Sequence, residues 1–124
     1  MKVMVVDDER DVQALFEQRF RKEIRDKEID FVFAFSGEEA LGFLRNVDHE
    51  AVLILSDINM PGMSGLELLK YIKNEHQDPP PFVMMITAYG DAENYNAAMR
   101  LGADDFLTKP VDFVQLKEKL KAIH

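Results

Sequence analysis

Short apolar runs alternate along this chain with segments in which apolar residues recur every three or four positions. Runs rich in aliphatic and β-branched residues are typical of strands buried on both faces of a sheet, and the longer period is typical of amphipathic helices. The runs predict five strands, at residues 3–6, 31–35, 52–55, 82–86 and 106–107. The segments between them predict five helices, at about residues 11–25, 36–44, 64–75, 91–101 and from 112 onwards.

Helix-capping signals agree with these boundaries. Three of the predicted helices begin with a side chain that can cap the first turn, followed three positions later by Glu or Gln: Ser36 and Glu39, Ser64 and Glu67, Asp112 and Gln115. Strands that alternate with helices form a parallel sheet covered on both faces, because crossover connections are right-handed. Of the two common orders, five strands suit the flavodoxin-like order 2-1-3-4-5. The predicted fold class is therefore α/β, a doubly wound five-stranded parallel sheet with five helices.

Chemically active side chains follow four of the predicted strands. Asp7 and Asp8 come after the first strand and Asp57 after the third. Thr87 comes after the fourth strand and Lys109 after the fifth. The order 2-1-3-4-5 makes these strands contiguous, and the carboxyl ends of parallel strands meet at the edge where α/β sheets bind ligands. We therefore expect three acids, a hydroxyl and an amine at one rim.

Three acids at one rim would repel one another unless a cation offset their charge. Carboxylate oxygens suit Mg²⁺, which keeps several waters and often bridges to phosphate. With Lys109 to neutralise oxygens, Thr87 as a donor and Asp57 as a nucleophile, the set fits phosphoryl transfer. The alternative is a surface acid patch with a purely structural Asp57–Lys109 ion pair. The functional interpretation is favoured, because four separate strand ends bring together the acids, the hydroxyl and the amine that phosphoryl transfer needs.

Over residues 1–124 the chain resembles a response-regulator receiver domain of two-component signalling. The resemblance rests on features in the family's order and spacing: Asp7-Asp8, Asp57, the turn MPGMSG at residues 60–65, Thr87-Ala88 and Lys109-Pro110. It implies a phosphoacceptor domain that receives a phosphoryl group from a histidine kinase or phosphotransfer protein. It implies no enzyme activity beyond the domain's own phosphorylation and dephosphorylation. The Lys109-Pro110 bond resembles the family's cis peptide.

By this resemblance Asp57 is the phospho-acceptor and Mg²⁺ is the cofactor. Asp8 and Asp57 resemble the carboxylate ligands of the ion, with the Asn59 backbone carbonyl as a third ligand. Asp7 resembles the residue that binds the ion through a water molecule. Lys109 would pair first with Asp57 and then with the phosphoryl oxygens.

The same resemblance assigns the signalling switch to Thr87, Ala88 and Phe106. Thr87 would donate a hydrogen bond to the phosphoryl group and move toward it, and the small Ala88 would leave room for the Phe106 ring to turn inward. The responding surface would be the fourth helix, fifth strand and fifth helix, about residues 91–123. An effector, or a second copy in a homodimer, would dock there.

Other functions fit these residues less well. A haloacid-dehalogenase-like phosphatase also uses an aspartyl nucleophile and Mg²⁺, but Asn59 stands where that family has its general acid. A flavodoxin-like cofactor binder needs a hydroxyl- and glycine-rich loop after the first strand, where Asp7-Asp8-Glu9 would repel a phosphate. A pseudo-receiver, an interaction module that is never phosphorylated, would not need the complete set of acids, hydroxyl and lysine.

Composition narrows the partners and the location. The net charge of −8 argues against direct nucleic-acid binding. No apolar run approaches the about 20 residues of a membrane span. The absence of cysteine excludes disulfide and thiolate chemistry. The start, MKVMVVDDE, does not have the form of a signal peptide, so we expect a cytoplasmic protein.

Overall fold

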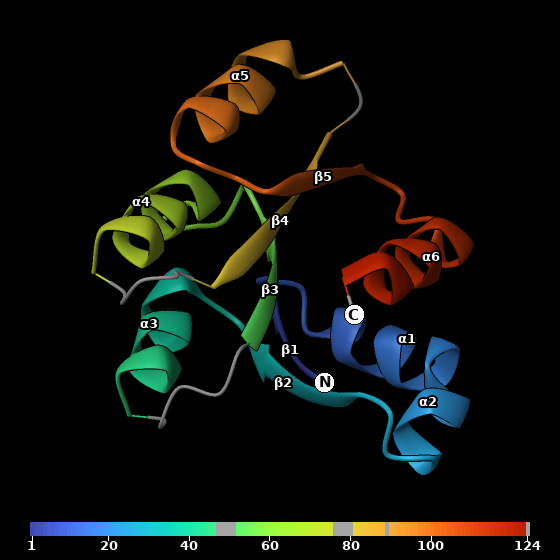
Figure 1. Ribbon diagram of the computed structural model, residues 1–124. Coiled ribbons are helices and arrows are strands. Elements are labelled where there is room, and N and C mark those ends of the chain that lie inside the picture. Colours follow the sequence, from blue (N-terminus) through green and yellow to red (C-terminus); the bar gives the residue numbers. More distant parts are fainter. Residues whose placement is uncertain (47–51, 76–80, 89, 124) are drawn as a thin grey trace.

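The computed structural model describes residues 1–46, 52–75, 81–88 and 90–123 (Figure 1). Its strands are β1 (Lys2–Val6), β2 (Asp30–Ala34), β3 (Val52–Asp57), β4 (Phe82–Thr87) and β5 (Asp105–Thr108). They form one sheet in the order β2-β1-β3-β4-β5, and every neighbouring pair is parallel. The predicted α/β fold and its strand order are confirmed.

Helices cover both faces of this sheet (Figure 1). They are α1 (Asp11–Arg19), α2 (Arg21–Arg25), α3 (Gly37–Asn46), α4 (Gly65–Glu75), α5 (Ala92–Arg100) and α6 (Phe113–Ile123). On one face, Ala40 of α3, Leu68 of α4 and Ala98 of α5 join a single buried cluster. On the other face, Phe16 of α1 and Leu116 of α6 join a second cluster. None of the described helices is long and apolar enough to span a bilayer.

The central strands are buried on both faces, as their uninterrupted apolar runs predict. In β1, Met4 and Val6 belong to one buried cluster, and Val3 and Val5 belong to the other. Each of these side chains is at most 3% exposed. Polar groups on such strands can reach solvent only at the strand ends, which is where the candidate functional residues lie.

The first helical segment differs from the single helix predicted at residues 11–25. It is divided into α1 and α2 at Phe20, where φ is −109° and ψ is 21°. The Phe20 ring is fully buried, with centroids 5.1–6.1 Å from the rings of Phe16, Phe31 and Phe113. The Phe20 N–H still donates to the Phe16 carbonyl, and the Ile24 N–H to the Phe20 carbonyl, each at 2.9 Å. Burial of this ring thus distorts the helix without ending its hydrogen bonding, and the described chain has six helices instead of five.

Helical periodicity predicts that the recurring apolar residues of a helix pack against the sheet, but three of them are exposed. Leu15 is 40% exposed, Ile24 37% and Ile123 38%. In the first helical segment, Phe16 and Phe20 of the same apolar face are at most 2% exposed, so the centre of that face is packed. Helical spacing shows which residues lie on the same face of a helix, but it does not show how much of that face is covered by the sheet. Leu15 lies at the edge of the contact, and Ile24 and Ile123 lie near the ends of their helices.

Side-chain caps begin three helices as predicted: the N–H of Glu39 donates to Ser36 Oγ (3.0 Å), that of Glu67 to Ser64 Oγ (3.2 Å) and that of Gln115 to Asp112 Oδ1 (3.2 Å). Each bond satisfies one of the free N–H groups of a first helical turn. Gly102 follows α5 with a φ of 97°, a left-handed conformation that glycine adopts without a steric cost. Local sequence chemistry therefore sets these helix boundaries.

Close backbone contact fixes the end of β3 against the start of α4. The Gly65 N–H donates to the Ile58 carbonyl at 2.7 Å. A Cβ atom at position 65 would overlap with the Asp57 backbone carbonyl and would lie 2.7 Å from Ile58 Cα. Glycine is therefore required here by space.

Replacement of Gly65 by alanine should lower the free energy of unfolding by about 3 kcal/mol, because the overlap forces β3 and α4 apart. Gly42→Ala is the matched control. Gly42 lies inside α3 and a Cβ there would meet no atom within 4 Å, so this change should stabilise the protein by about 0.5–1 kcal/mol. Urea unfolding measures both effects, and equal effects of the two substitutions would contradict the close contact at Gly65.

Candidate functional site

The carboxylates of Asp7, Asp8 and Asp57 meet at the carboxyl edge of the sheet. One oxygen atom of each lies within 4.8 Å of the others. Asp57 is the last residue of β3 and pairs in register with Ile86 of β4, whereas the sequence analysis placed the strand end at residue 55. Asp57 is 3% exposed and Asp7 is 7% exposed, while Asp8 is at the surface. The three acids thus form a small site whose open side is at Asp8.

Backbone groups hold Asp7 in place. Its N–H donates to the Ala34 carbonyl at 3.1 Å, and its Oδ1 accepts from the Glu9 N–H at 2.9 Å. Burial raises the pKa of Asp7; the Glu9 N–H opposes this effect, and the nearby charge of Asp57 adds to it. The net pKa is above the usual value, so the ionised form of Asp7 is destabilised by its surroundings.

Lys109 approaches the same carboxylates from the segment directly after β5. Its Nζ lies 2.7 Å from Asp57 Oδ2, and its backbone N–H donates to the Thr87 carbonyl at 2.9 Å. Burial alone would lower the pKa of Lys109, but the hydrogen bond and the charge of Asp57 outweigh burial and raise it. Lys109 is therefore a cation at neutral pH. The Lys109-Pro110 peptide bond is cis, as the resemblance implied.

The donor chemistry of the cluster fits a hard divalent cation such as Mg²⁺. The side-chain donors are all carboxylate oxygens, which Mg²⁺ prefers, and the open side at Asp8 leaves room for the waters that this ion keeps. Lys109 occupies Asp57 Oδ2, so Oδ1 is the oxygen available to a cation. The Asn59 N–H lies 3.4 Å from this Oδ1, which places the main chain of Asn59 beside the cluster.

The predicted switch residues lie at the end of β4 and in β5. Thr87 is the last residue of β4 and is buried, and its hydroxyl donates to the Leu107 carbonyl at a long 3.5 Å. Ala88 follows it and is exposed. Phe106 is half-buried in β5, and its ring lies 4.3 Å from that of Tyr95 in α5. Thr87 and Phe106 therefore lie on neighbouring strands, and the Phe106 ring contacts α5 through Tyr95.

Sequence reasoning missed two contacts between the loops of this rim. The Arg10 guanidinium lies 4.4 Å above the Phe35 ring and joins the segments that follow β1 and β2. The Glu38 carboxylate of α3 accepts from the Met63 N–H at 3.4 Å and joins the segment that follows β3. The partners are far apart along the chain and carry no shared motif. Only the strand order, 2-1-3-4-5, brings their loops together.

The fold and the site together define a class of protein: a flavodoxin-like domain with an acidic, lysine-paired site at the carboxyl edge of its sheet. The family model of the response regulator receiver domain matches residues 3–121. The chain therefore belongs to this family, the phosphoacceptor signalling domains of two-component response regulators.

Curated relatives are similar to this chain over nearly its whole length. The response regulator protein PilR of Pseudomonas aeruginosa is 38% identical over 117 residues, which are 94% of this chain and 24% of PilR. The transcriptional regulatory protein CpxR of Klebsiella pneumoniae is 36% identical over 123 residues, which are 98% of this chain and 48% of CpxR. The chain thus spans less than half the length of these relatives.

Solved structures have the same fold. A response regulator receiver protein from Pseudomonas putida superposes with a TM-score of 0.83 at 29% identity, covering 98% of this chain and 95% of its own. The receiver domain of NtrX from Brucella abortus gives 0.79 at 31% identity, covering 97% and 95%. The receiver domain of Ssk1 from Saccharomyces cerevisiae, crystallised with the histidine phosphotransfer protein Ypd1, is matched with 0.81 at 26% identity, covering 96% and 85%.

We expect the acidic cluster to destabilise the fold when no metal ion is bound. Mg²⁺ should stabilise the fold. At a hundredfold excess over its Kd, Mg²⁺ should add about 2.7 kcal/mol to the free energy of unfolding. Asp7→Asn should raise the stability without metal, because the amide oxygen still accepts from Glu9 and a buried charge beside Asp57 is removed. Asp8→Asn should change the metal-free stability less and should remove most of the response to Mg²⁺.

Urea unfolding in EDTA and in Mg²⁺ checks these expectations. Asp26→Asn is a matched control, because Asp26 is exposed next to α2 and pairs at the surface with Arg25. Its response to Mg²⁺ should equal that of the unmutated protein. Equal stability of the unmutated protein with and without Mg²⁺ would contradict the cation site.

Proposed function

We propose that Asp57 is the phospho-acceptor of one receiver domain that spans residues 1–124. The observation that carries this proposal is the 2.7 Å contact between Lys109 Nζ and Asp57 Oδ2, beside the carboxylates of Asp7 and Asp8. An Asp57 oxygen attacks the phosphorus of a phosphohistidine. A P–O bond forms as the P–N bond breaks, and the imidazole leaves. The domain catalyses only its own phosphorylation and dephosphorylation and is in this sense not an enzyme.

Lys109 and Thr87 act on the transferred group. After transfer, Lys109 Nζ turns from the carboxylate to the phosphoryl oxygens, and its raised pKa keeps it charged while it does so. The Thr87 hydroxyl exchanges its long hydrogen bond to the Leu107 carbonyl for a shorter one to a phosphoryl oxygen. Both changes need little rearrangement. Lys109 already contacts Asp57, and Thr87 ends β4, the strand next to β3.

Four residues would hold Mg²⁺ at this site. Asp8 and Asp57 would supply carboxylate oxygens, Asn59 its backbone carbonyl, and Asp7 a contact through water. The bound ion supplies positive charge that neutralises the phosphoryl oxygens during transfer. The raised pKa of Asp7 supports this role, since a carboxylate that its surroundings destabilise gains from a nearby cation.

Thr87, Ala88 and Phe106 would carry the signal away from Asp57. As Thr87 moves toward the phosphoryl group, the small side chain of Ala88 leaves space for the Phe106 ring to turn inward. Because that ring lies 4.3 Å from Tyr95, its displacement reaches α5 directly. The responding surface is then α5, β5 and α6.

The energy of this switch requires a pre-existing equilibrium. Burial of an aromatic ring contributes about 1.5–3 kcal/mol. Reversal of a 1:99 population needs about 5.5 kcal/mol. Ring burial alone therefore cannot complete the switch, and the unphosphorylated protein must already populate the active state, which phosphorylation then favours.

The upstream partner would be a histidine kinase or a phosphotransfer protein, which the co-crystal of Ypd1 with the receiver domain of Ssk1 supports by similarity. The downstream partner would be an effector domain or protein, or a second copy of the chain, on the surface of α5, β5 and α6. The net charge of −8 gives no support for direct nucleic-acid binding by this domain.

Neither alternative function is as well supported. For a haloacid-dehalogenase-like phosphatase, the exposed amide of Asn59 cannot serve as the general acid. A pseudo-receiver is never phosphorylated, so it would have no use for a buried carboxylate that contacts Lys109 and lies near two further acids. The family match also points to phosphoacceptor signalling.

Acetyl phosphate with Mg²⁺ should add one phosphoryl group to the protein, measured as intact mass. Asp57→Asn should abolish this addition, because an amide is a poor nucleophile, whereas Asp26→Asn should leave it unchanged. Lys109→Ala should still bind Mg²⁺ but should give a weaker conformational response to phosphorylation. Full labelling of Asp57→Asn would refute the acceptor, and continuous hydrolysis of phosphomonoesters would favour the phosphatase.

Phe106→Ala should leave phosphorylation of Asp57 nearly normal and weaken the response of α5, β5 and α6. Amide NMR shifts with and without beryllofluoride, a phosphoryl mimic, measure this response. Phe43→Ala is the control, because Phe43 is an exposed aromatic residue in α3, away from the switch. In the unmutated protein, shifts confined to the residues around Asp57 would contradict the proposed path.

A further inference from the structure

The segment at the end of β2 carries none of the proposed metal ligands, yet it contacts both of the loops that carry them. We call residues 34–38 the bridging segment. Asp7 and Asp8 directly follow β1, whereas Asp57 ends β3 and Asn59 lies in the loop after it. Because β1 lies between β2 and β3 in the sheet, a contact from the bridging segment to the β3 loop spans the carboxyl end of β1.

The first set of contacts holds the loop that carries Asp7 and Asp8. The Ala34 carbonyl accepts from the Asp7 N–H at 3.1 Å. The Phe35 ring lies 4.4 Å from the guanidinium of Arg10, a cation–π contact. Arg10 stands two residues after Asp8 and caps the start of α1. Asp8 is therefore flanked by two residues that both contact the bridging segment.

The second set of contacts supports the turn that follows Asn59. The Glu38 carboxylate accepts from the Met63 N–H at 3.4 Å. Gly37 lies so close to the same residue that a Cβ atom at position 37 would be 2.9 Å from Met63 Cγ and Sδ and 3.0 Å from its Cβ. The Met63 side chain also packs against the buried cluster on this face of the sheet, so it has little room to move away. The turn is therefore seated directly on the start of α3.

The coordination chemistry of Mg²⁺ makes the relative position of these two loops important. Mg²⁺ requires near-ideal octahedral geometry with ligands at about 2.0–2.1 Å, whereas Ca²⁺ accepts about 6–8 oxygen ligands in a flexible arrangement. A small shift of either loop should therefore weaken Mg²⁺ binding more than Ca²⁺ binding. Groups that orient metal ligands without touching the ion typically change metal affinity by about 10–100-fold.

We propose that Phe35 and Gly37 are positioning residues for the metal site. Phe35 holds the loop that carries Asp8, and Gly37 lets the turn after Asn59 lie against α3. Neither residue is a ligand; together they set the distance between the ligands on the two loops and so favour Mg²⁺ over Ca²⁺. This inference rests on the proposed function, because it concerns the site at which Mg²⁺ would act.

Two alanine substitutions in α3 test the contact with the second loop. Gly37→Ala places a Cβ atom against Met63 and should displace the turn, so the Mg²⁺ affinity should fall about tenfold. The Ca²⁺ affinity should fall less, because Ca²⁺ tolerates displaced ligands. Gly42→Ala is the control, since a Cβ there meets no atom within 4 Å, and it should preserve both affinities. Amide NMR titrations with each ion measure the affinities and show that the variants are folded.

Phe35→Leu tests the contact with the first loop. Leucine keeps an apolar side chain but offers no ring face to Arg10, so the ratio of Mg²⁺ to Ca²⁺ affinity should again fall. Phe43→Leu, at an exposed aromatic residue of α3, is the matched control and should leave the ratio unchanged. All four substitutions preserve the net charge, so a change in the electrostatic attraction of cations cannot produce the effect.

The outcomes separate this inference from the proposed function. If Gly37→Ala and Phe35→Leu bind Mg²⁺ as tightly as the unmutated protein, or lose Mg²⁺ and Ca²⁺ affinity equally, the positioning role is overturned and the metal site stands. If the unmutated protein binds no Mg²⁺, the metal site is overturned and the positioning role with it.

Discussion

The ion pair between Asp57 and Lys109 is the interaction on which the functional edge depends. A carboxylate that is only 3% exposed, beside the buried Asp7, needs a cation in direct contact. Lys109 supplies it from the end of β5 and so joins the ends of β3 and β5 across β4. Because the Lys109 side chain is itself 41% exposed, the pair can open toward an incoming group without disturbing the core.

The neighbouring ends of β3 and β4 differ in how firmly they are held. The end of β3 is fixed by the 2.7 Å hydrogen bond from Gly65 to Ile58 and by a backbone approach that admits no Cβ. At the end of β4, the Thr87 hydroxyl has only a 3.5 Å hydrogen bond. The Thr87 carbonyl, however, accepts from the Lys109 N–H at 2.9 Å, so a shift of Thr87 also moves the chain after β5. The end of β3, which carries Asp57, is thus held more firmly than the Thr87 side chain at the end of β4.

The sequence was sufficient for the parts of the structure that follow from local rules. Uninterrupted apolar runs predict doubly buried strands, and strand order then brings Asp7, Asp57 and Lys109 to one edge whatever the details of packing. The break at Phe20 could not be predicted, because it depends on rings from β2 and α6 that are distant in the chain. The exposure of Leu15 likewise depends on how wide a contact the sheet offers, which periodicity does not encode.

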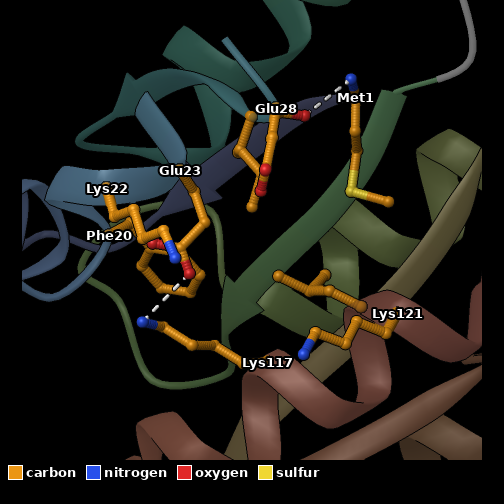
Figure 2. Close-up of a pocket in the computed structure, with 9 residues that line it drawn as sticks. Met1, Phe20, Lys22, Glu23, Glu28, Lys117 and Lys121 are labelled. Atoms are coloured by element: carbon orange, nitrogen blue, oxygen red, sulfur yellow. Dashed lines mark hydrogen bonds and ion pairs between the residues drawn. The ribbon is translucent and has the colours of Figure 1, made fainter. Parts of the chain in front are cut away.

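The two edges of the sheet differ in charge, and helix direction accounts for part of the difference. In a parallel α/β fold the helices begin at the carboxyl edge and end at the amino edge, so Lys121 in the last turn of α6 complements the negative end of the helix dipole. The dipole gives a structural reason for a lysine at this edge. At the same edge, Glu23 of α2 pairs with Lys117 of α6 at 3.0 Å, and this ion pair joins the two helices (Figure 2).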